Sequence, residues 1–373
     1  MDKRVTLAVA GAGKTYHICH TIRPEQRNLI LAYTHENIFN IRNELIDAHG
    51  SIPELTTVMT FDSFVYRYFI CPYEPTIAEH FGRHDFISKG ITTVDPPTRT
   101  LNRKGRSIPN PKYKPKDQLE HYITYRAQYY CATLSELVMS VKSGTDALIK
   151  RAAARINLFF DQVLIDEFQD FREHDYDLIV TLAKYLNSIL LVGDYYQHSV
   201  SAVNNSGKPF KKRNTDICYS DYVAALKRAR FIVDESSLSK SRRCSENVCA
   251  YVSRKLGINI ESAGINQGKV IWIKENQLEP ILQSPSIVKL VYSDAKSCSF
   301  EAINWSYSKG DTVNAACVIL TDSFEEMEKP EFSAKGIPTS TINKLYVAMT
   351  RTKGDLYLVK ASIFRKYKEH HAK

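Results

Sequence analysis

Residues 8–15, AVAGAGKT, constrain the fold of this chain more than any other stretch. A β-rich run, RVTLAVA, leads into Gly11 and Gly13, and a helix-like stretch follows them. Glycines between a strand and a helix let successive backbone N–H groups turn into one cavity, and the helix presents its positive N-terminal end there. The segment therefore predicts a phosphate-binding loop that includes the backbone of Ala10, Gly11, Ala12 and Gly13.

Lys14 and Thr15 complete this loop chemically. Lys14 stands where a lysine reaches the β- and γ-phosphates of a nucleotide, and the Thr15 hydroxyl stands where it completes a Mg²⁺ shell. Ala8 departs from the usual pattern, because it occupies the first glycine position of G-x-x-x-x-G-K-[ST]. Taken alone, the loop leaves a second reading open, a glycine turn between a strand and a helix that binds nothing.

Two later strands also end in chemically useful side chains. FFDQVLIDEFQD runs out into Asp166 and Glu167, and ILLVGDYYQ places Asp194 and Gln197 at its end. Open α/β sheets bind ligands at the carboxyl ends of their strands, so these residues and the loop are expected at one edge. We expect Asp166 to hold Mg²⁺, Glu167 to orient and deprotonate the attacking water, and Gln197 to sense the γ-phosphate.

The wider pattern predicts an α/β protein with parallel sheets flanked by helices, because short apolar runs alternate with helical segments. Between residues 66 and 149 the composition turns to Tyr, Pro, Lys and Arg, and past residue 230 a second series of candidate strands appears, beginning with FIVDES. We predict a first lobe from residues 1–65 and 150–232, an inserted accessory subdomain over 66–149, and a second lobe over 233–373.

The charge of the chain favours an anionic partner such as nucleic acid, since 50 Lys and Arg against 41 Asp and Glu give a net charge of +9. Residues 99–116 are basic and contain no acid, and residues 207–214 form a second basic patch; a solvated surface loop is the alternative for both. No apolar run is long enough to span a bilayer, and the eight cysteines form no C-x-x-C pair. We expect a cytoplasmic protein without a membrane partner.

Taken together, AVAGAGKT, LIDEFQD, VGDYYQ and KLYVAMTRTKGDLYL resemble the motifs of the UvrD/Rep-like branch of superfamily I DNA helicases. Members of that family often begin the loop with Ala, so Ala8 fits. LAYTHENIFNIRNEL and MTFDSF are similar to the family's DNA-contacting motifs, and LSKSRRCSENV and NWSYSKGDTVNAACVIL to its second-lobe motifs. The resemblance spans nearly the whole chain and implies two RecA-like P-loop lobes.

The resemblance also implies a site that binds ATP and Mg²⁺ between the lobes. Arg243 and Arg351 of the second lobe would close on the γ-phosphate, and Arg242 stands where the family carries a Tyr that stacks on adenine. The implied catalytic residues are Lys14, Glu167, Gln197, Arg243 and Arg351. The implied cofactor-binding residues are Ala10, Gly11, Ala12, Gly13, Lys14, Thr15, Arg242 and Gly310, and the metal ligands are Thr15 and Asp166. The implied nucleic-acid contacts are Tyr33, Thr34, Thr60, Phe61, Tyr196 and His198.

The resemblance implies an ATP-dependent translocase or helicase on single-stranded DNA. Two departures bear on its coupling to nucleic acid. The stretch HSVSAVNN has Ala202 where the family carries a base-stacking aromatic, and Arg243 and Lys309 stand too close in sequence for the family's large second accessory subdomain. Two alternatives stay open: a nucleotide-gated DNA-binding ATPase subunit of a larger repair or antiviral complex, and an RNA helicase. The preference for ATP over GTP also stays open.

Overall fold

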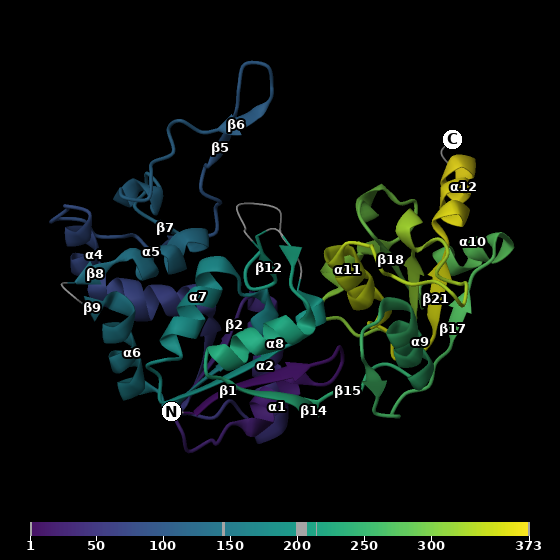
Figure 1. The fold of residues 1–373 in the computed structure, drawn as a ribbon, viewed down its shortest axis with the longest axis horizontal. Coiled ribbons are helices and arrows are strands. Elements are labelled where there is room, and N and C mark those ends of the chain that lie inside the picture. Colours follow the sequence, from purple (N-terminus) through teal and green to yellow (C-terminus); the bar gives the residue numbers. More distant parts are fainter. Residues whose placement is uncertain (1, 144–145, 199–206, 214, 372–373) are drawn as a thin grey trace.

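The computed structural model describes residues 2–143, 146–198, 207–213 and 215–371. Two parallel β-sheets stand at opposite ends of the molecule's long axis, each covered by helices (Figure 1). The α/β fold predicted from the alternating pattern is therefore confirmed. No helix in the described part of the chain is both long enough and apolar enough to cross a membrane.

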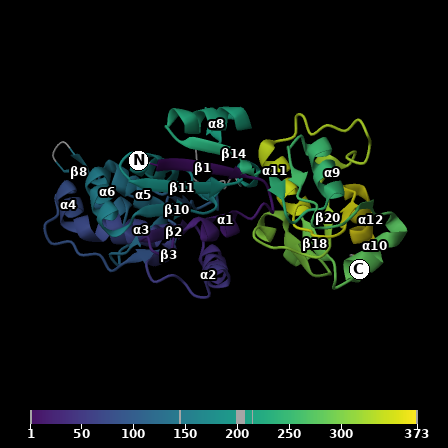
Figure 2. The ribbon, with the colours of Figure 1, turned by 90° about the horizontal axis from the view of Figure 1, so that it is seen from below.

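The first sheet has six strands in the order β14-β1-β11-β10-β2-β3, which Figure 2 shows in succession. The strands are β1 (Asp2–Ala8), β2 (Asn28–Ala32), β3 (Thr56–Thr60), β10 (Gln162–Ile165), β11 (Ser188–Gly193) and β14 (Ile232–Leu238). Their buried side chains alternate between two apolar clusters, as the period of a strand requires. One cluster packs under α1 (Lys14–Thr21) and α2 (His35–His49), and the other under α6 (Leu148–Phe159), α7 (Glu173–Leu182) and α8 (Tyr219–Arg228).

The region predicted as an insertion has a packed part and a projecting part. Short helices α3 (Phe61–Val65), α4 (Glu74–His80) and α5 (Leu134–Ser140) contribute side chains to the same apolar cluster as α6 and α7. The hairpin of β5 (Arg99–Leu101) and β6 (Ser107–Pro109) extends away from the body of the protein (Figure 1). The basic stretch found in the sequence therefore lies largely on an exposed hairpin and the loop that follows it.

The second sheet has five strands in the order β17-β21-β20-β18-β19. They are β17 (Val270–Trp272), β18 (Val288–Val291), β19 (Ala302–Asn304), β20 (Ala316–Ile319) and β21 (Leu356–Val359). Helices α9 (Glu246–Leu256) and α11 (Thr339–Met349) cover one face, and α10 (Glu275–Gln283) and α12 (Ala361–His371) cover the other. We call the part built on the first sheet the first lobe (residues 2–238) and the remainder the second lobe (residues 239–371).

One strand lies in a different sheet from the one predicted. FIVDES was expected to open the second lobe, but β14 pairs in parallel with β1 and forms the edge of the first sheet. The preceding helix α8 buries Tyr222, Val223 and Leu226 in the first lobe, so the chain returns beside β1 and supplies hydrogen-bond partners to its free edge. This position of β14 delivers the following residues directly to the phosphate loop.

Candidate active site

The predicted phosphate loop joins β1 to α1, and two of its glycines adopt backbone angles that favour glycine. Gly11 and Gly13 have φ values of +73° and +86°. A Cβ at Gly11 would also lie 2.6 Å from Cβ of Arg243 and 2.8 Å from Oγ of Ser241. Glycine is thus required at this position both for the turn and for the close approach of the segment that follows β14.

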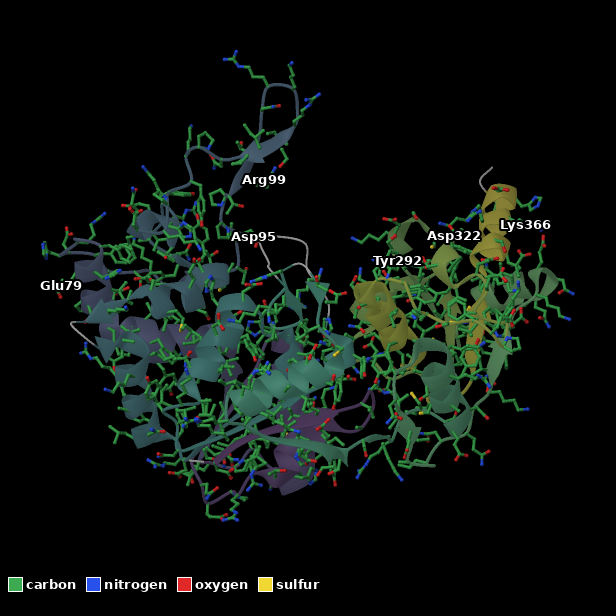
Figure 3. The ribbon with its side chains drawn as sticks, viewed as in Figure 1. Glu79, Asp95, Arg99, Tyr292, Asp322 and Lys366 are labelled. Atoms are coloured by element: carbon green, nitrogen blue, oxygen red, sulfur yellow. The ribbon has the colours of Figure 1, made fainter. Side chains whose placement is uncertain are left out.

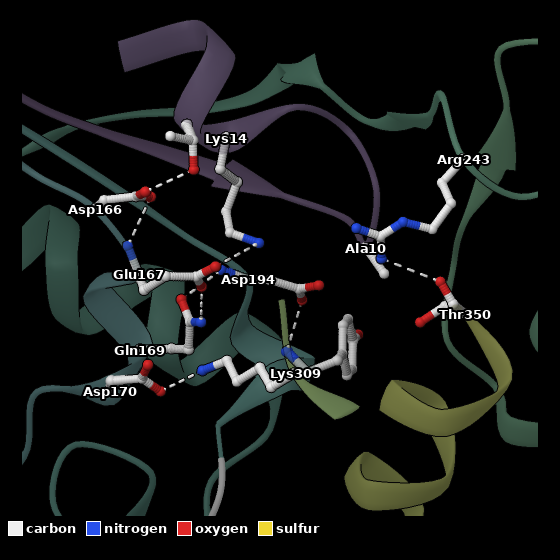
Figure 4. A network of polar contacts seen from close by, with 12 residues as sticks. Ala10, Lys14, Asp166, Glu167, Gln169, Asp170, Asp194, Arg243, Lys309 and Thr350 are labelled. Carbon is white, nitrogen blue, oxygen red and sulfur yellow. Dashed lines mark hydrogen bonds and ion pairs between the residues drawn. The ribbon is translucent and has the colours of Figure 1, made fainter. Parts of the chain in front are cut away.

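The acids at the end of β10 lie against the loop (Figure 4). The Thr15 hydroxyl donates to a carboxylate oxygen of Asp166 at 2.8 Å, and Lys14 Nζ lies 3.4 Å from Glu167 Oε1. The side-chain amide of Gln169 donates to the other carboxylate oxygen of Glu167. The first two predicted elements, the loop and the paired acids, therefore meet at one edge of the sheet.

A single cavity of about 230 Å³ joins these groups to the second lobe. From the first lobe it is lined by Gly11, Gly13, Lys14, Thr15, Tyr16, Asn37, Asn40, Glu44, Asp166, Glu167 and Gln197, and from the second lobe by Arg243, Gly310 and Arg351. Gln197 at the third predicted strand end is buried and faces the same space. Five residues predicted to be catalytic thus share one cavity, and Gly310 lies at its rim.

The hydroxyl of Thr15 and the carboxylate of Asp166 fit a Mg²⁺ ion, which prefers oxygen ligands and commonly binds through one or two protein groups plus phosphate and water. Across residues 2–143, 146–198, 207–213 and 215–371, no group of three or more His, Cys, Asp or Glu could hold a metal by itself.

The charged groups of the cavity shift the pKa values of the neighbouring carboxylates. Burial acts to raise the pKa of Glu167, but the cations of Lys14 and Lys309 outweigh it and lower that pKa to about 2. Burial and the neighbouring Glu167 raise the pKa of Asp166 to about 6. Glu167 is thus an ionised partner of Lys14 when no nucleotide is bound. A triphosphate would compete for Lys14, and loss of that cation would make Glu167 a stronger base.

Arg351 has a buried guanidinium with an unused donor. Its side chain is 2% exposed, Nε donates to the Val347 carbonyl at 2.9 Å, and Nη2 has no hydrogen-bond partner among the described residues. Burial and the nearby charge of Arg243 lower the pKa of Arg351 to about 10. A buried cationic donor without a partner is costly, and an anion in the cavity would satisfy it.

Two further residues connect the lobes and were missed in the sequence. Lys309 Nζ pairs with Asp170 at 2.5 Å, and the hydroxyl of Tyr346 donates to Asp194 Oδ2 at 3.2 Å. Lys309 directly precedes Gly310 in the K-G pair, and Tyr346 lies within the YVAMTR stretch that supplies Arg351. Their motifs were visible, but the partner of each side chain depends on how the two lobes pack.

The predicted base-stacking residue Arg242 lies beside the cavity rather than in its lining. Its guanidinium carbon is 5.4 Å from the ring centroid of Tyr16, and its backbone N–H donates to the Gly11 carbonyl at 2.9 Å. Tyr16, which does line the cavity, follows Thr15 in sequence and was not predicted. The ring of Tyr16 and the guanidinium of Arg242 therefore lie together at the part of the cavity next to Thr15.

The predicted nucleic-acid contacts at the ends of β2 and β3 divide into two groups. Tyr33 and Thr34 are exposed, and the Thr34 hydroxyl caps α2 by accepting from Asn37 N at 3.1 Å. Thr60 and Phe61 are both buried. The Thr60 hydroxyl caps α3, and the ring of Phe61 packs against Phe171 with the ring centroids 4.9 Å apart. The predicted contact of the Phe61 side chain with nucleic acid is wrong for this structure, since the ring fills the core.

The two predicted nucleic-acid contacts that follow β11 are packed against other rings of the first lobe. His198 is 4% exposed and its ring stacks on Phe210 with centroids 3.8 Å apart, so its predicted contact with a base is wrong for this structure. Tyr196 is half-buried and lies parallel to Tyr219 at 5.8 Å. Ala202 lies outside the described residues.

The fold and this cavity define a class: a two-lobed α/β protein whose candidate phosphate site takes acids from one lobe and arginines from the other. Residues 98–199 match a family model described as the UvrD/REP helicase N-terminal domain. The match includes the basic hairpin, the paired acids and the Asp194–His198 loop. This match confirms the UvrD/Rep-like resemblance over that part of the chain.

Two solved structures are similar to this chain. One is described as "Complex structure of Arterivirus nonstructural protein 10 (helicase) with DNA" and the other as "The structure of PRRSV helicase". Each has a TM-score of 0.44, 13% sequence identity and a match over 96% of this chain. The match covers 61% of the first of those chains and 52% of the second. None of the curated proteins matches this sequence.

Proposed function

We propose that this chain is an ATP-dependent translocase or helicase that acts on single-stranded DNA. The observation that carries the proposal is the shared cavity, in which Lys14 and Glu167 of the first lobe face Arg243 and Arg351 of the second. Because neither lobe holds all of these groups, a triphosphate that engages them would draw the lobes together. Its hydrolysis would release them, and such closure and opening is a common source of directed movement.

Each side chain has a role that its position supports. Lys14 would neutralise phosphate charge, and Thr15 with Asp166 would hold a Mg²⁺ ion that offsets the charge of the phosphate oxygens. Glu167 would accept a proton from the attacking water. The guanidinium groups of Arg243 and Arg351 would stabilise the charge that develops on the transferred phosphoryl group.

The nucleic-acid surface in this proposal comprises exposed residues of the first lobe. Tyr33 lies at the carboxyl end of β2 with 47% of its surface exposed, so its ring is available to stack on a base. The β5–β6 hairpin and the loop after it present the basic residues of 99–116 (Figure 3, near Arg99). We also propose the inserted region as the accessory part that follows the phosphate backbone.

Addition of single-stranded DNA is expected to stimulate ATP hydrolysis by at least about fivefold, the lower end of ordinary coupling between two sites. The measurement is phosphate release by the full chain with Mg²⁺, with and without a DNA or RNA oligonucleotide. Stimulation by RNA alone would favour the RNA helicase. Nucleotide binding without stimulation by either strand would favour the nucleotide-gated subunit.

Replacement of Arg103, Lys104 and Arg106 by Ala is expected to weaken binding of single-stranded DNA. These three residues lie at the exposed end of the hairpin. Log affinity falls as log salt concentration rises, and loss of three phosphate contacts would make this negative slope less steep by about 2. Fluorescence anisotropy at several salt concentrations measures both effects. The matched control is the triple alanine variant of Arg365, Lys366 and Lys368 on α12, which should bind DNA like the wild type; equal affinity in the hairpin variant would contradict the assignment.

A further inference from the structure

The hydroxyl of Tyr346 joins three segments that are far apart in sequence. It accepts a hydrogen bond from the backbone N–H of Ala10 at 2.8 Å and donates to Asp194 Oδ2 at 3.2 Å. Ala10 belongs to the phosphate loop and Asp194 directly follows β11 (Figure 4), whereas Tyr346 lies on α11 of the second lobe (Figure 1). The side chain is fully buried, so water cannot replace either partner.

The surroundings of Ala10 show the same association with the second lobe. Ala10 is fully buried and belongs to the apolar cluster of the second lobe, together with Leu345 and Met349 of α11. Helix α11 also contacts the Asp194–His198 loop, where the side-chain amide of Asn343 lies 3.3 Å from the ring nitrogens of His198. Of these two polar residues on α11, Tyr346 is the one bonded to the phosphate loop.

We propose that Tyr346 is a positioning residue whose hydroxyl holds the phosphate loop and Asp194 in register with α11, the helix that leads into Arg351. This inference rests on the proposed function and adds a named coupling group to it. Arg351 lies two residues beyond the end of α11 and its Nε donates to the Val347 carbonyl of that helix, so a shift of α11 relative to Ala10 would move the guanidinium relative to bound phosphates. Misplacement of a catalytic group by about 1 Å can cost about 10²-fold in rate.

The hydroxyl, rather than the ring, is the group that matters in this proposal. The ring packs edge-on against Tyr196 with centroids 6.0 Å apart, and Phe at position 346 would keep that contact. It would leave the Ala10 N–H and the Asp194 carboxylate without this partner. Loss of a hydrogen bond to a charged group changes an equilibrium by roughly tenfold or more, and here the affected equilibrium is the alignment of the two lobes.

The Tyr346→Phe variant is expected to lower kcat for ATP hydrolysis about tenfold or more, while KM for ATP changes less than about threefold. Lys14 and the phosphate-facing backbone of the loop remain in the variant, so ground-state binding persists. The matched control is Tyr251→Phe, which removes a buried hydroxyl of the second lobe that donates to the Met327 carbonyl at 3.1 Å. That control should keep the wild-type kcat.

A double-mutant cycle with Asp194→Ala separates positioning from general destabilisation. If the hydroxyl acts in part through Asp194, the double variant loses less activity than the product of the two single losses. Binding of a fluorescent ATP analogue verifies that each variant is folded. An unchanged kcat in Tyr346→Phe, or strictly multiplicative losses, would overturn the inference while hydrolysis by the wild type leaves the proposed function standing. Absence of hydrolysis in the wild type would overturn both.

Discussion

The Glu167→Gln variant is expected to bind ATP and to hydrolyse it about 10²–10⁴-fold more slowly than the wild type. Glutamine has the size of glutamate and keeps an oxygen that can accept from Gln169, but it cannot take a proton from water. It also carries no charge to hold Lys14, whose Nζ lies 3.4 Å from Glu167 Oε1. Nucleotide affinity should therefore stay constant or rise. Phosphate release and fluorescent-nucleotide binding measure the two effects separately.

The control for this variant is Glu275→Gln. Glu275 lies on the surface of α10 in the second lobe, where its carboxylate pairs with Lys366 at 3.3 Å. It should hydrolyse ATP nearly as fast as the wild type. Lys14→Ala provides the opposite pattern, because it should lose tight nucleotide binding itself. Wild-type turnover in Glu167→Gln would remove Glu167 from the water-activating role.

The phosphate end of the site was predictable from the sequence because its geometry is local. Gly11 and Gly13 fix the turn, Lys14 and Thr15 open the helix after it, and Asp166 directly follows a strand. Parallel strands with helical connections bring their carboxyl ends to the same edge, so the loop and the acids had to meet. All of these residues belong to the first lobe, so their meeting does not depend on how the second lobe packs.

The interlobe contacts were not predictable in the same way. The pairing of Lys309 with Asp170, and of Tyr346 with Ala10 and Asp194, depends on the packing of two sheets that share no strand. Strand β14 illustrates the same limit, because its short apolar start suits either sheet and only the position of α8 decides between them.

The burial of aromatic rings was a second feature that could not be predicted from the sequence motifs. Phe61 and His198 fall in stretches that resemble nucleic-acid motifs, yet both rings are packed inside the protein. The sequence alone does not distinguish an aromatic ring that fills the core from one that stacks on a base. The exposed ring of Tyr33 could be distinguished from them only after the fold placed it at the end of β2.

The Arg351→Ala variant is expected to lose about 10³-fold or more in kcat, the effect of removing an arginine that stabilises a transferred phosphoryl group. The fork of Arg351 is held by the bond from Nε to Val347, and its free Nη2 donor is the one available to phosphate. Arg351→Lys retains the charge but not the fork, so it should recover only part of the lost rate. Steady-state hydrolysis at saturating ATP compares the three proteins, with Arg365→Ala on α12 as an exposed control.

Thermal unfolding tests the proposed contact of Arg351 with the nucleotide independently of hydrolysis. Burial and the charge of Arg243 both disfavour the charged form of Arg351, and a bound anion would offset that penalty. ATP should therefore raise the melting temperature of the wild type more than that of Arg351→Ala, because the variant has no buried charge for the nucleotide to neutralise. Equal shifts, together with a kcat within tenfold of the wild type, would place Arg351 outside the phosphate site and leave Arg243 as the cation that the second lobe contributes.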